Sequence, residues 1–142
     1  MKSLTRQIIA PGTALEIVQT ALADARGQGL EVAVAVTDPF GVLAAFGKTD
    51  GALASVGTFA QDKAYTAGLQ GKSTKAFGER MASSPSLTMG LASRERFLVW
   101  GGGVSIWEGD ACIGGLGVSG AQDHEDIAIA EAAIRAVGLE PR

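Results

Sequence analysis

The sequence predicts one α+β domain in which helices pack on a single antiparallel sheet of five strands. Five short apolar segments follow one another with mostly tight turns between them, which favours antiparallel pairing. Three longer segments repeat apolar residues at gaps of three and four, the spacing of amphipathic helices. The chain has 142 residues, 46% of them hydrophobic, so residues 1–142 are expected to form one domain with a substantial core.

The elements are expected in the order α-β-β-α-α-β-β-β-α. Helices are expected over residues 13–27, 55–69, 73–81 and 123–137. Strands are expected over residues 31–37, 42–46, 96–100, 104–107 and 111–118. The stretch 82–94 is small and polar, and it is predicted to be a loop with one helical turn.

Local signals define the ends of the N-terminal elements. Thr13 stands three residues before Glu16, which is the spacing of a capping box at the start of the first helix. Residues 38–41 (DPFG) fit a type I turn with proline second and glycine fourth, so the first two strands are expected to form a hairpin. Ser73 or Thr74 is expected to cap the third helix.

Glycine is concentrated in the C-terminal half, at residues 101–103 and 114–120. Glycine weakens a strand, so such positions usually mark a bend or a surface that another group approaches closely. The run GGLG at residues 114–117 does not fit the G-x-G-x-x-G dinucleotide fingerprint and does not open a βαβ unit. Strand curvature and close packing are therefore the favoured interpretation. The expected close approach lies between the last strand, the last helix and the helix that carries Lys63.

Composition and charge exclude several classes of partner. The net charge is −3 and no run of lysine or arginine occurs, so neither nucleic acid nor an anionic membrane surface is expected as a partner. Cys112 is the only cysteine, which excludes an internal disulfide and a multi-cysteine metal site. No apolar run is long enough for a signal peptide or a membrane span, so a cytoplasmic location is expected.

Lys63 is the most informative charged residue, because it falls on the otherwise apolar stripe of the second helix. Two interpretations have equal weight. Burial would lower the pKa of the ammonium and make it usable as a base. Alternatively, the aliphatic stem packs along the edge of the core while the ammonium reaches water.

The start of the last helix holds two further candidates, behind Asp123 as the expected N-cap. His124 is the only histidine, so any haem, metal or acid–base chemistry of an imidazole must use it. The competing interpretation is an exposed first-turn residue. Asp126 is a candidate hydrogen-bond acceptor for a ligand or a neighbouring subunit, or an acidic residue that serves the helix dipole alone.

Aromatic residues and methionines give weaker signals. The aromatic side chains either line a flat apolar pocket or belong to the core and to subunit contacts: Phe77, Phe97, Trp100 and Trp107. The methionines are either soft ligands of iron or packing filler: Met81 and Met89.

Several motifs in order along nearly the whole chain add up to a family resemblance. They are Val36–Gly41 (VTDPFG), Asp50–Ala52 (DGA), Lys63–Ala67 (KAYTA), Gly102-Gly103, and Ile113–Gly120 (IGGLGVSG) followed by Asp126. Together they resemble the signature of the GlcG/HbpS-like family, also called DUF336. One departure is that the family's GG.P element lacks its proline here, where Ser105 stands nearby.

The resemblance implies a profilin-like fold with a five-stranded antiparallel sheet flanked by helices. It also implies homo-oligomers, often octamers, and members that bind haem or are fused to cobalamin adenosyltransferases. Carried over to this chain, the resemblance places a functional surface at five positions: Asp38, Lys63, Ser119, Gly120 and Asp126.

Three functions stay open at this point. The first is a small-ligand-binding homo-oligomer, with haem as the candidate ligand and His124 as its candidate axial residue. The second is a cofactor-independent enzyme of small-molecule catabolism, in which Lys63 is the base and Asp126 its partner across a subunit interface. The third is an accessory subunit of a catabolic enzyme. No metal other than haem iron is expected.

Overall fold

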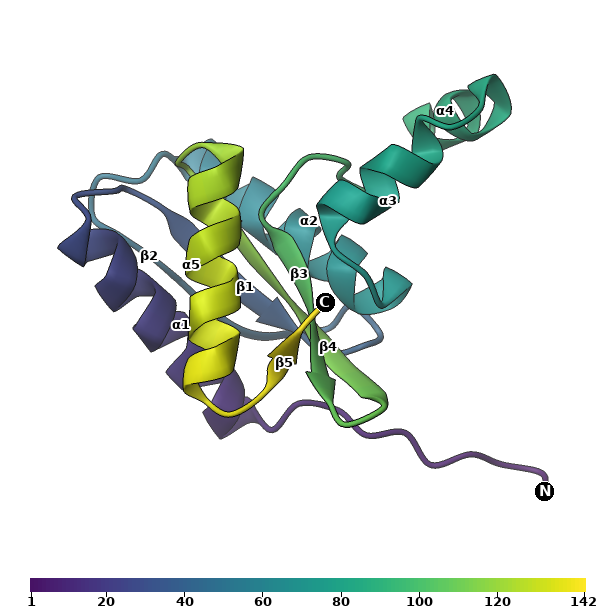
Figure 1. Cartoon of the computed structure of the whole chain (residues 1–142), viewed down its shortest axis with the longest axis horizontal. Helices are drawn as coiled ribbons and strands as arrows, with labels where there is room; N and C mark the ends of the chain where they lie inside the picture. Colours follow the sequence, from purple (N-terminus) through teal and green to yellow (C-terminus); the bar gives the residue numbers. More distant parts are fainter.

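The computed structural model describes residues 1–142 and contains one five-stranded antiparallel sheet in the order β2-β1-β4-β3-β5 (Figure 1). The strands are β1 (Ala33–Thr37), β2 (Leu43–Lys48), β3 (Gly103–Glu108), β4 (Ala111–Ser119) and β5 (Glu140–Pro141). The helices are α1 (Pro11–Gly27), α2 (Ala54–Gln70), α3 (Thr74–Met81), α4 (Pro85–Ala92) and α5 (Asp123–Ala136). The predicted α+β class and the five-stranded antiparallel sheet are confirmed.

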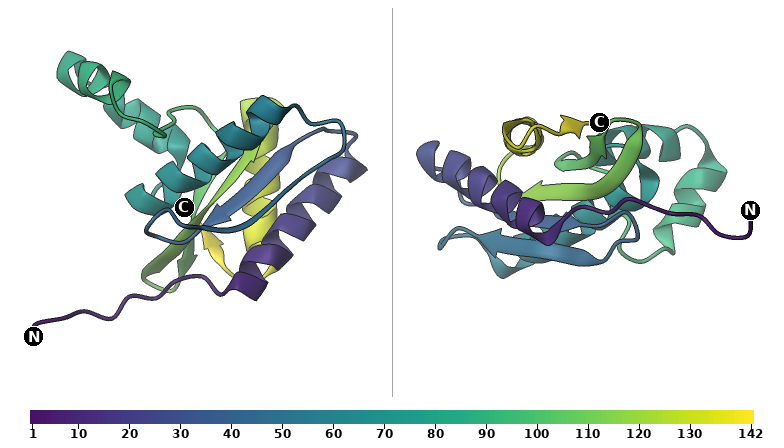
Figure 2. Two further views of the ribbon diagram at one scale, coloured as in Figure 1. Left: turned by 180° about the vertical axis from the view of Figure 1, so that it is seen from behind. Right: turned by 90° about the horizontal axis from the view of Figure 1, so that it is seen from below.

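Helices cover both faces of the sheet. The helices α1 and α5 lie on one face, and α2 crosses the other (Figure 2). The alternation of side chains along β1 explains this arrangement, because successive residues point to opposite faces. Val34 and Val36 join the large core beneath α1 and α5. Ala33 and Ala35 point the other way and pack against Ala60 and Ala64 of α2.

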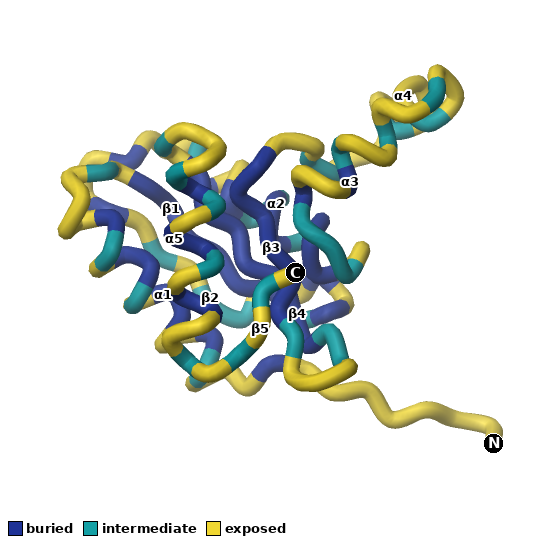
Figure 3. Tube along the Cα trace, in the orientation of Figure 1, coloured by how far each residue is buried: buried dark blue, intermediate teal, exposed yellow.

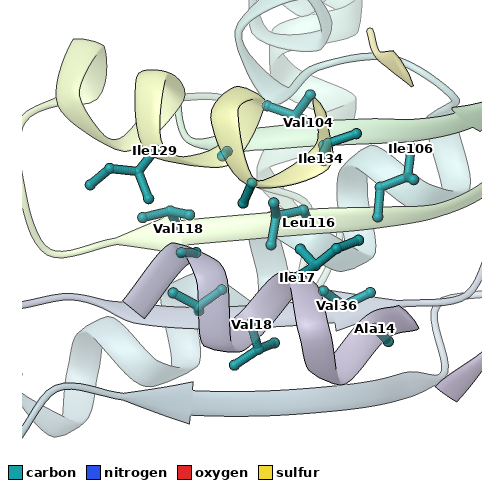
Figure 4. Packing of buried hydrophobic residues seen from close by; sticks show 14 of the residues in the cluster. Ala14, Ile17, Val18, Val36, Val104, Ile106, Leu116, Val118, Ile129 and Ile134 are labelled. Atoms are coloured by element: carbon teal, nitrogen blue, oxygen red, sulfur yellow. The ribbon is translucent and has the colours of Figure 1, made fainter. Parts of the chain in front are cut away.

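The large core is built from aliphatic side chains of five elements, α1, β1, β3, β4 and α5 (Figure 4). Ile17 comes from α1, Leu116 from the central strand β4, and Ile134 from α5, and all three are fully buried. Burial of each such side chain contributes about 1.5–3 kcal/mol to folding. Small residues of the opposite face, among them Ala33, Ala35, Gly115 and Gly117, lie beneath α2, so this helix lies close to the sheet.

The fifth strand is not the expected one. Residues 96–100 form no strand, and β5 pairs with β3 in their place. The physical reason is a competing partner: Thr66 on α2 donates its hydroxyl to the carbonyl of Arg96 at 3.3 Å and accepts the N–H of Leu98 at 3.0 Å. These bonds take up backbone groups that a sheet ladder would have used.

Two N-terminal cap predictions were wrong. The first helix begins at Pro11, with Ala10 as N-cap and no side-chain cap, so the expected Thr13–Glu16 capping box is not formed. Proline suits this position because its missing N–H would have had no partner. The last helix is capped one residue earlier than expected, by Gln122 rather than Asp123. The Ser73 cap of α3 is confirmed, since its hydroxyl accepts the N–H of Ala76 at 3.1 Å.

Residues 82–94 hold a helix of eight residues, α4, where a loop with one helical turn was expected. Ser84 caps it and Pro85 occupies its first turn, two start signals that the irregular composition concealed. Together α3 and α4 form an arm that projects from the sheet, and α4 has no buried residue (Figures 1 and 3). None of the helices has both the length and the apolarity needed to cross a bilayer.

Candidate functional site

Lys63 and Asp126, the two residues predicted to carry catalysis, meet inside one chain. The Lys63 Nζ lies 3.3 Å from Asp126 Oδ2, and the two side chains are only 1% and 2% exposed. The ammonium also donates to the carbonyl of Val118 at 2.8 Å. The snorkelling alternative for Lys63 is therefore wrong, because the charged end itself is buried. The pair also forms within a single subunit rather than across an interface.

Burial controls the electrostatics of this pair. Desolvation lowers the pKa of the Lys63 ammonium, and the neighbouring Asp126 carboxylate counteracts part of that shift. Desolvation likewise raises the pKa of the Asp126 carboxyl, and here Lys63 acts in the opposite direction. Each charge therefore depends on its partner. Removing one partner of a buried pair leaves an uncompensated charge, which typically costs about 3–5 kcal/mol.

The glycine-rich strand β4 lies directly against α2, which confirms the expected close approach. A Cβ added to Gly117 would lie 2.0 Å from the carbonyl oxygen of Ala60, and one on Gly115 would lie 2.2 Å from that of Ala64. A Cβ on Gly102 would lie 2.6 Å from the Lys63 Nζ. The space between strand and helix is therefore filled by protein, so these glycines serve packing rather than a ligand cavity at this seam.

The other residues implied by the resemblance do not all gather at one surface. Ser119 is buried at the end of β4 opposite Ala33, whereas Asp38 lies beyond Thr37, at the opposite end of the same strand pair. Asp38 shapes the β1–β2 turn by accepting the N–H groups of residues 40 and 42. Gly120 has a φ of 133° and lies against the backbone of residues 31–32.

None of the five surface concavities is lined by Lys63, Asp126, Asp38, Ser119 or Gly120. A substrate would have no open route to the buried pair in this conformation. The catalytic role of the pair and the ligand-binding role of the other three residues stay predictions.

His124 lies in the largest of the concavities, which has a volume of about 540 Å³. We call it the His124 concavity; its walls come from α3, the segment before β3 and the first turns of α5. Its principal side chains are Lys75, Glu79, Val99, Trp100, His124 and Ile127. His124 is exposed, as one of its two interpretations expected. The concavity therefore joins an accessible imidazole to an indole and an ammonium.

Neighbouring contacts position the indole and the backbone on either side of His124. The ring of Trp100 meets that of Phe59 edge-on, with centroids 5.6 Å apart. Asp123, the first residue of α5, accepts the N–H of Gly101 at 3.0 Å through Oδ2, which ties the residues beside Trp100 and His124 together. Glu125 accepts the N–H of Gln122 at 3.2 Å and completes the start of the helix.

A second concavity of about 420 Å³ lies between the arm and the domain. It is lined by Phe77 and Phe97, which pack on each other at 5.7 Å, together with Met81 and Arg94. We call it the arm concavity. The four aromatic residues noted in the sequence are therefore divided among different places, and Trp107 lies in a third concavity beside Cys112.

Sequence reasoning missed Lys75 and Glu79 as members of the His124 concavity. A signal for them existed, because Lys75, Gly78, Glu79 and Ala82 recur at gaps of three and four and so share one face of α3. Nothing local pairs that face with residues 99–101 or with α5. The contact is close: a Cβ on Gly78 would lie 2.1 Å from the carbonyl oxygen of Val99.

Comparison with known proteins gives one family and one curated relative. The family described as haem-degrading, HbpS-like proteins matches residues 9–135. The corrinoid adenosyltransferase PduO of Salmonella typhimurium is 28% identical over 126 residues. That match covers 87% of this chain and 37% of PduO, so the chain spans little more than a third of the length of this relative.

The fold is shared with several solved structures, of which three illustrate the likeness. ORFY of Klebsiella pneumoniae, a DUF336 protein, has a TM-score of 0.89 at 24% identity, covering 97% of this chain and 96% of ORFY. A double mutant of HbpS from Streptomyces reticuli has a TM-score of 0.85 at 26% identity, covering 95% and 90% of the two chains. A PduOC–haem complex has a TM-score of 0.84 at 23% identity, covering 93% and 96%.

Proposed function

This chain belongs to the HbpS-like family of haem-degrading proteins, and on that premise we propose that it binds haem in the His124 concavity. The observation that carries the proposal is the position of the only histidine. His124 lies exposed in the largest surface concavity, beside an indole and an ammonium. Imidazole is a common protein ligand of haem iron.

The side chains present fit the parts of a haem molecule. The macrocycle is a flat apolar plate, and Val99, Trp100 and Ile127 offer it partly exposed apolar surface. Exposed apolar side chains grouped in one hollow favour an apolar ligand. The ammonium of Lys75 can pair with a propionate, and His124 can coordinate the iron. Bound haem would supply a redox-active iron; the chain itself binds and orients the group.

Titration with haemin, followed by visible absorption, tests this proposal. Wild-type protein should give a saturable shift of the Soret band at micromolar haemin, and His124→Ala should weaken binding at least tenfold and change the band position. Met81→Leu in the arm concavity is the matched control, because it removes another candidate iron ligand, outside the His124 concavity, and should leave the titration unchanged. Loss of binding in Met81→Leu with normal binding in His124→Ala would refute the proposed site.

Self-association is the second part of the proposal. Large apolar side chains stay exposed on and beside α2, including Leu53 at 70%, Phe59 at 38% and Leu69 at 38%. Such groups favour a subunit contact over a monomer. Size-exclusion chromatography with light scattering should show a homo-oligomer, and a purely monomeric protein at micromolar concentration would contradict this part.

An accessory role in catabolism is the second candidate function. It is favoured by the match to PduO, in which a segment like this chain accounts for little more than a third of the protein. A wild-type chain that neither binds haemin nor turns over a small molecule, yet raises the activity of a purified partner enzyme, would support this role over haem binding.

A further inference from the structure

We infer that the buried Lys63–Asp126 pair is a positioning device that holds His124 at the edge of its concavity. Its consequence for haem rests on the function proposed above, whereas its consequence for the geometry of α5 does not. Lys63 and Asp126 are then positioning residues, because neither reaches the concavity in which His124 lies.

Asp126 uses both carboxylate oxygens to fix the entry to α5. Its Oδ2 accepts from the Lys63 ammonium at 3.3 Å, and its Oδ1 accepts the N–H of Ala121 at 3.1 Å. The same ammonium donates to the carbonyl of Val118 at 2.8 Å. One buried group of atoms therefore joins α2, the end of β4, the connection after β4 and the first turn of α5. His124 lies in the sequence between Ala121 and Asp126, the two residues that this hydrogen bond joins.

A second set of contacts ties the opposite wall of the concavity to the same group. The N–H of Val118 donates to the carbonyl of Gly102 at 2.9 Å, and the N–H of Gly101 donates to Asp123 Oδ2 at 3.0 Å. Gly102 has a φ of 121°, and a Cβ there would lie 2.6 Å from the Lys63 Nζ. The backbone that carries Trp100 is thus linked to the backbone that carries His124.

A buried, hydrogen-bonded ion pair fixes the relative orientation of the elements it joins, which an apolar contact does not do. Replacement of a buried ion pair by apolar residues is often neutral or stabilising, so stability alone gives little reason for it. The ammonium here has two acceptors and the carboxylate two donors, all within 3.3 Å. Apolar substitutes would fill the volume, but they would make no directed bonds from the first turn of α5 to the Ala121 N–H and to α2.

The single histidine makes this inference measurable without any ligand. Protein labelled with ¹³C-histidine gives one native imidazole signal, which reports on His124 alone. Lys63→Met and Asp126→Asn should each shift or broaden that signal and speed hydrogen exchange at the Ala121 amide at least tenfold. Ile134→Ala is the matched control: it weakens the same helix in the core, two turns from the pair, and should leave both readouts unchanged.

Haemin binding gives the second readout. Both pair variants should weaken haemin binding at least tenfold and move the Soret band towards its position in His124→Ala, whereas Ile134→Ala, with a similar loss of melting temperature, should bind normally. A wild-type imidazole signal and exchange rate in both pair variants would overturn the inference, as would equal changes in Ile134→Ala. If the wild type binds no haemin, the proposed function fails, while the ligand-free readouts still decide the inference.

A milder substitution, Asp123→Ala, covers the case in which the Lys63 and Asp126 variants do not fold. Asp123 is exposed and makes only the tie to Gly101, so Asp123→Ala should fold. It should leave the Ala121 amide protected, because that amide donates to Asp126 and not to Asp123. An Ala121 amide that loses its protection in Asp123→Ala, with the pair still in place, would also overturn the inference.

Discussion

Replacement of Gly117 by alanine tests the close packing of α2 on β4. The added Cβ would lie 2.0 Å from the carbonyl oxygen of Ala60 and 2.7 Å from the backbone nitrogen of Ala64. Both are backbone atoms of α2, so no side-chain rotation relieves the clash. The helix would have to move away from the sheet by about 1 Å before the contact became tolerable.

Overpacking in a well-packed core costs about 1–3 kcal/mol and occasionally more. The upper end applies here, because the new Cβ also lies 2.9 Å from the Cβ of Lys63, and any shift of α2 disturbs the buried pair. For a domain of this size a loss of about 3 kcal/mol lowers the melting temperature by roughly 10 °C.

Thermal and urea unfolding of Gly117→Ala measures this cost. Gly12→Ala is the matched control, since a Cβ on Gly12 meets nothing within 4 Å and alanine is the better helix former. The control should be neutral or slightly stabilising. Equal unfolding midpoints for Gly117→Ala and wild type would refute the account of the glycine-rich strand.

Three further predictions concern separate parts of the chain. Asp38→Ala removes the acceptor for two backbone N–H groups of the β1–β2 turn and should lower stability by about 1–2 kcal/mol in urea; an unchanged midpoint would contradict that role. Burial raises the pKa of the Cys112 thiol above its ordinary 9.0, so the unfolded chain ionises first and stability should fall as the pH rises above 9.0. The rate of Cys112 alkylation against pH should accordingly have its midpoint above 9.0, and a midpoint at or below 9.0 would be inconsistent with burial. Glu79→Gln removes a carboxylate from the rim of the His124 concavity and should tighten haemin binding, whereas Lys75→Gln should weaken it; the reverse order would show that the propionates lie elsewhere.

Periodicity and turn chemistry predicted most of the fold. The apolar stripe of α2 and the alternation in β1 are local patterns, and the turn at residues 38–41 forms with the expected bond from the Gly41 N–H to the Asp38 carbonyl. The fifth strand was beyond such reasoning. Residues 96–100 have the composition of a strand, but Thr66, thirty residues earlier in the chain, takes their backbone groups.

The candidate site was only partly predictable for the same physical reason. Lys63 stood out because it interrupts an apolar stripe, and Asp126 because it belongs to a family motif. That they pair with each other depends on how α2 and α5 pack on opposite faces of β4, which no local pattern encodes. The concavity around His124 likewise needs three separate segments to meet. The sequence therefore identified candidate site residues, and the packing of the elements determines which of them are accessible.

The most direct test of haem binding at His124 is the imidazole signal of ¹³C-histidine-labelled protein, recorded with and without haemin. Ferric haem is paramagnetic, so a coordinated imidazole should lose its diamagnetic signal in proportion to occupancy, and the loss should be complete at one equivalent per site. An imidazole signal that stays in place and sharp at saturating haemin would contradict the proposed site.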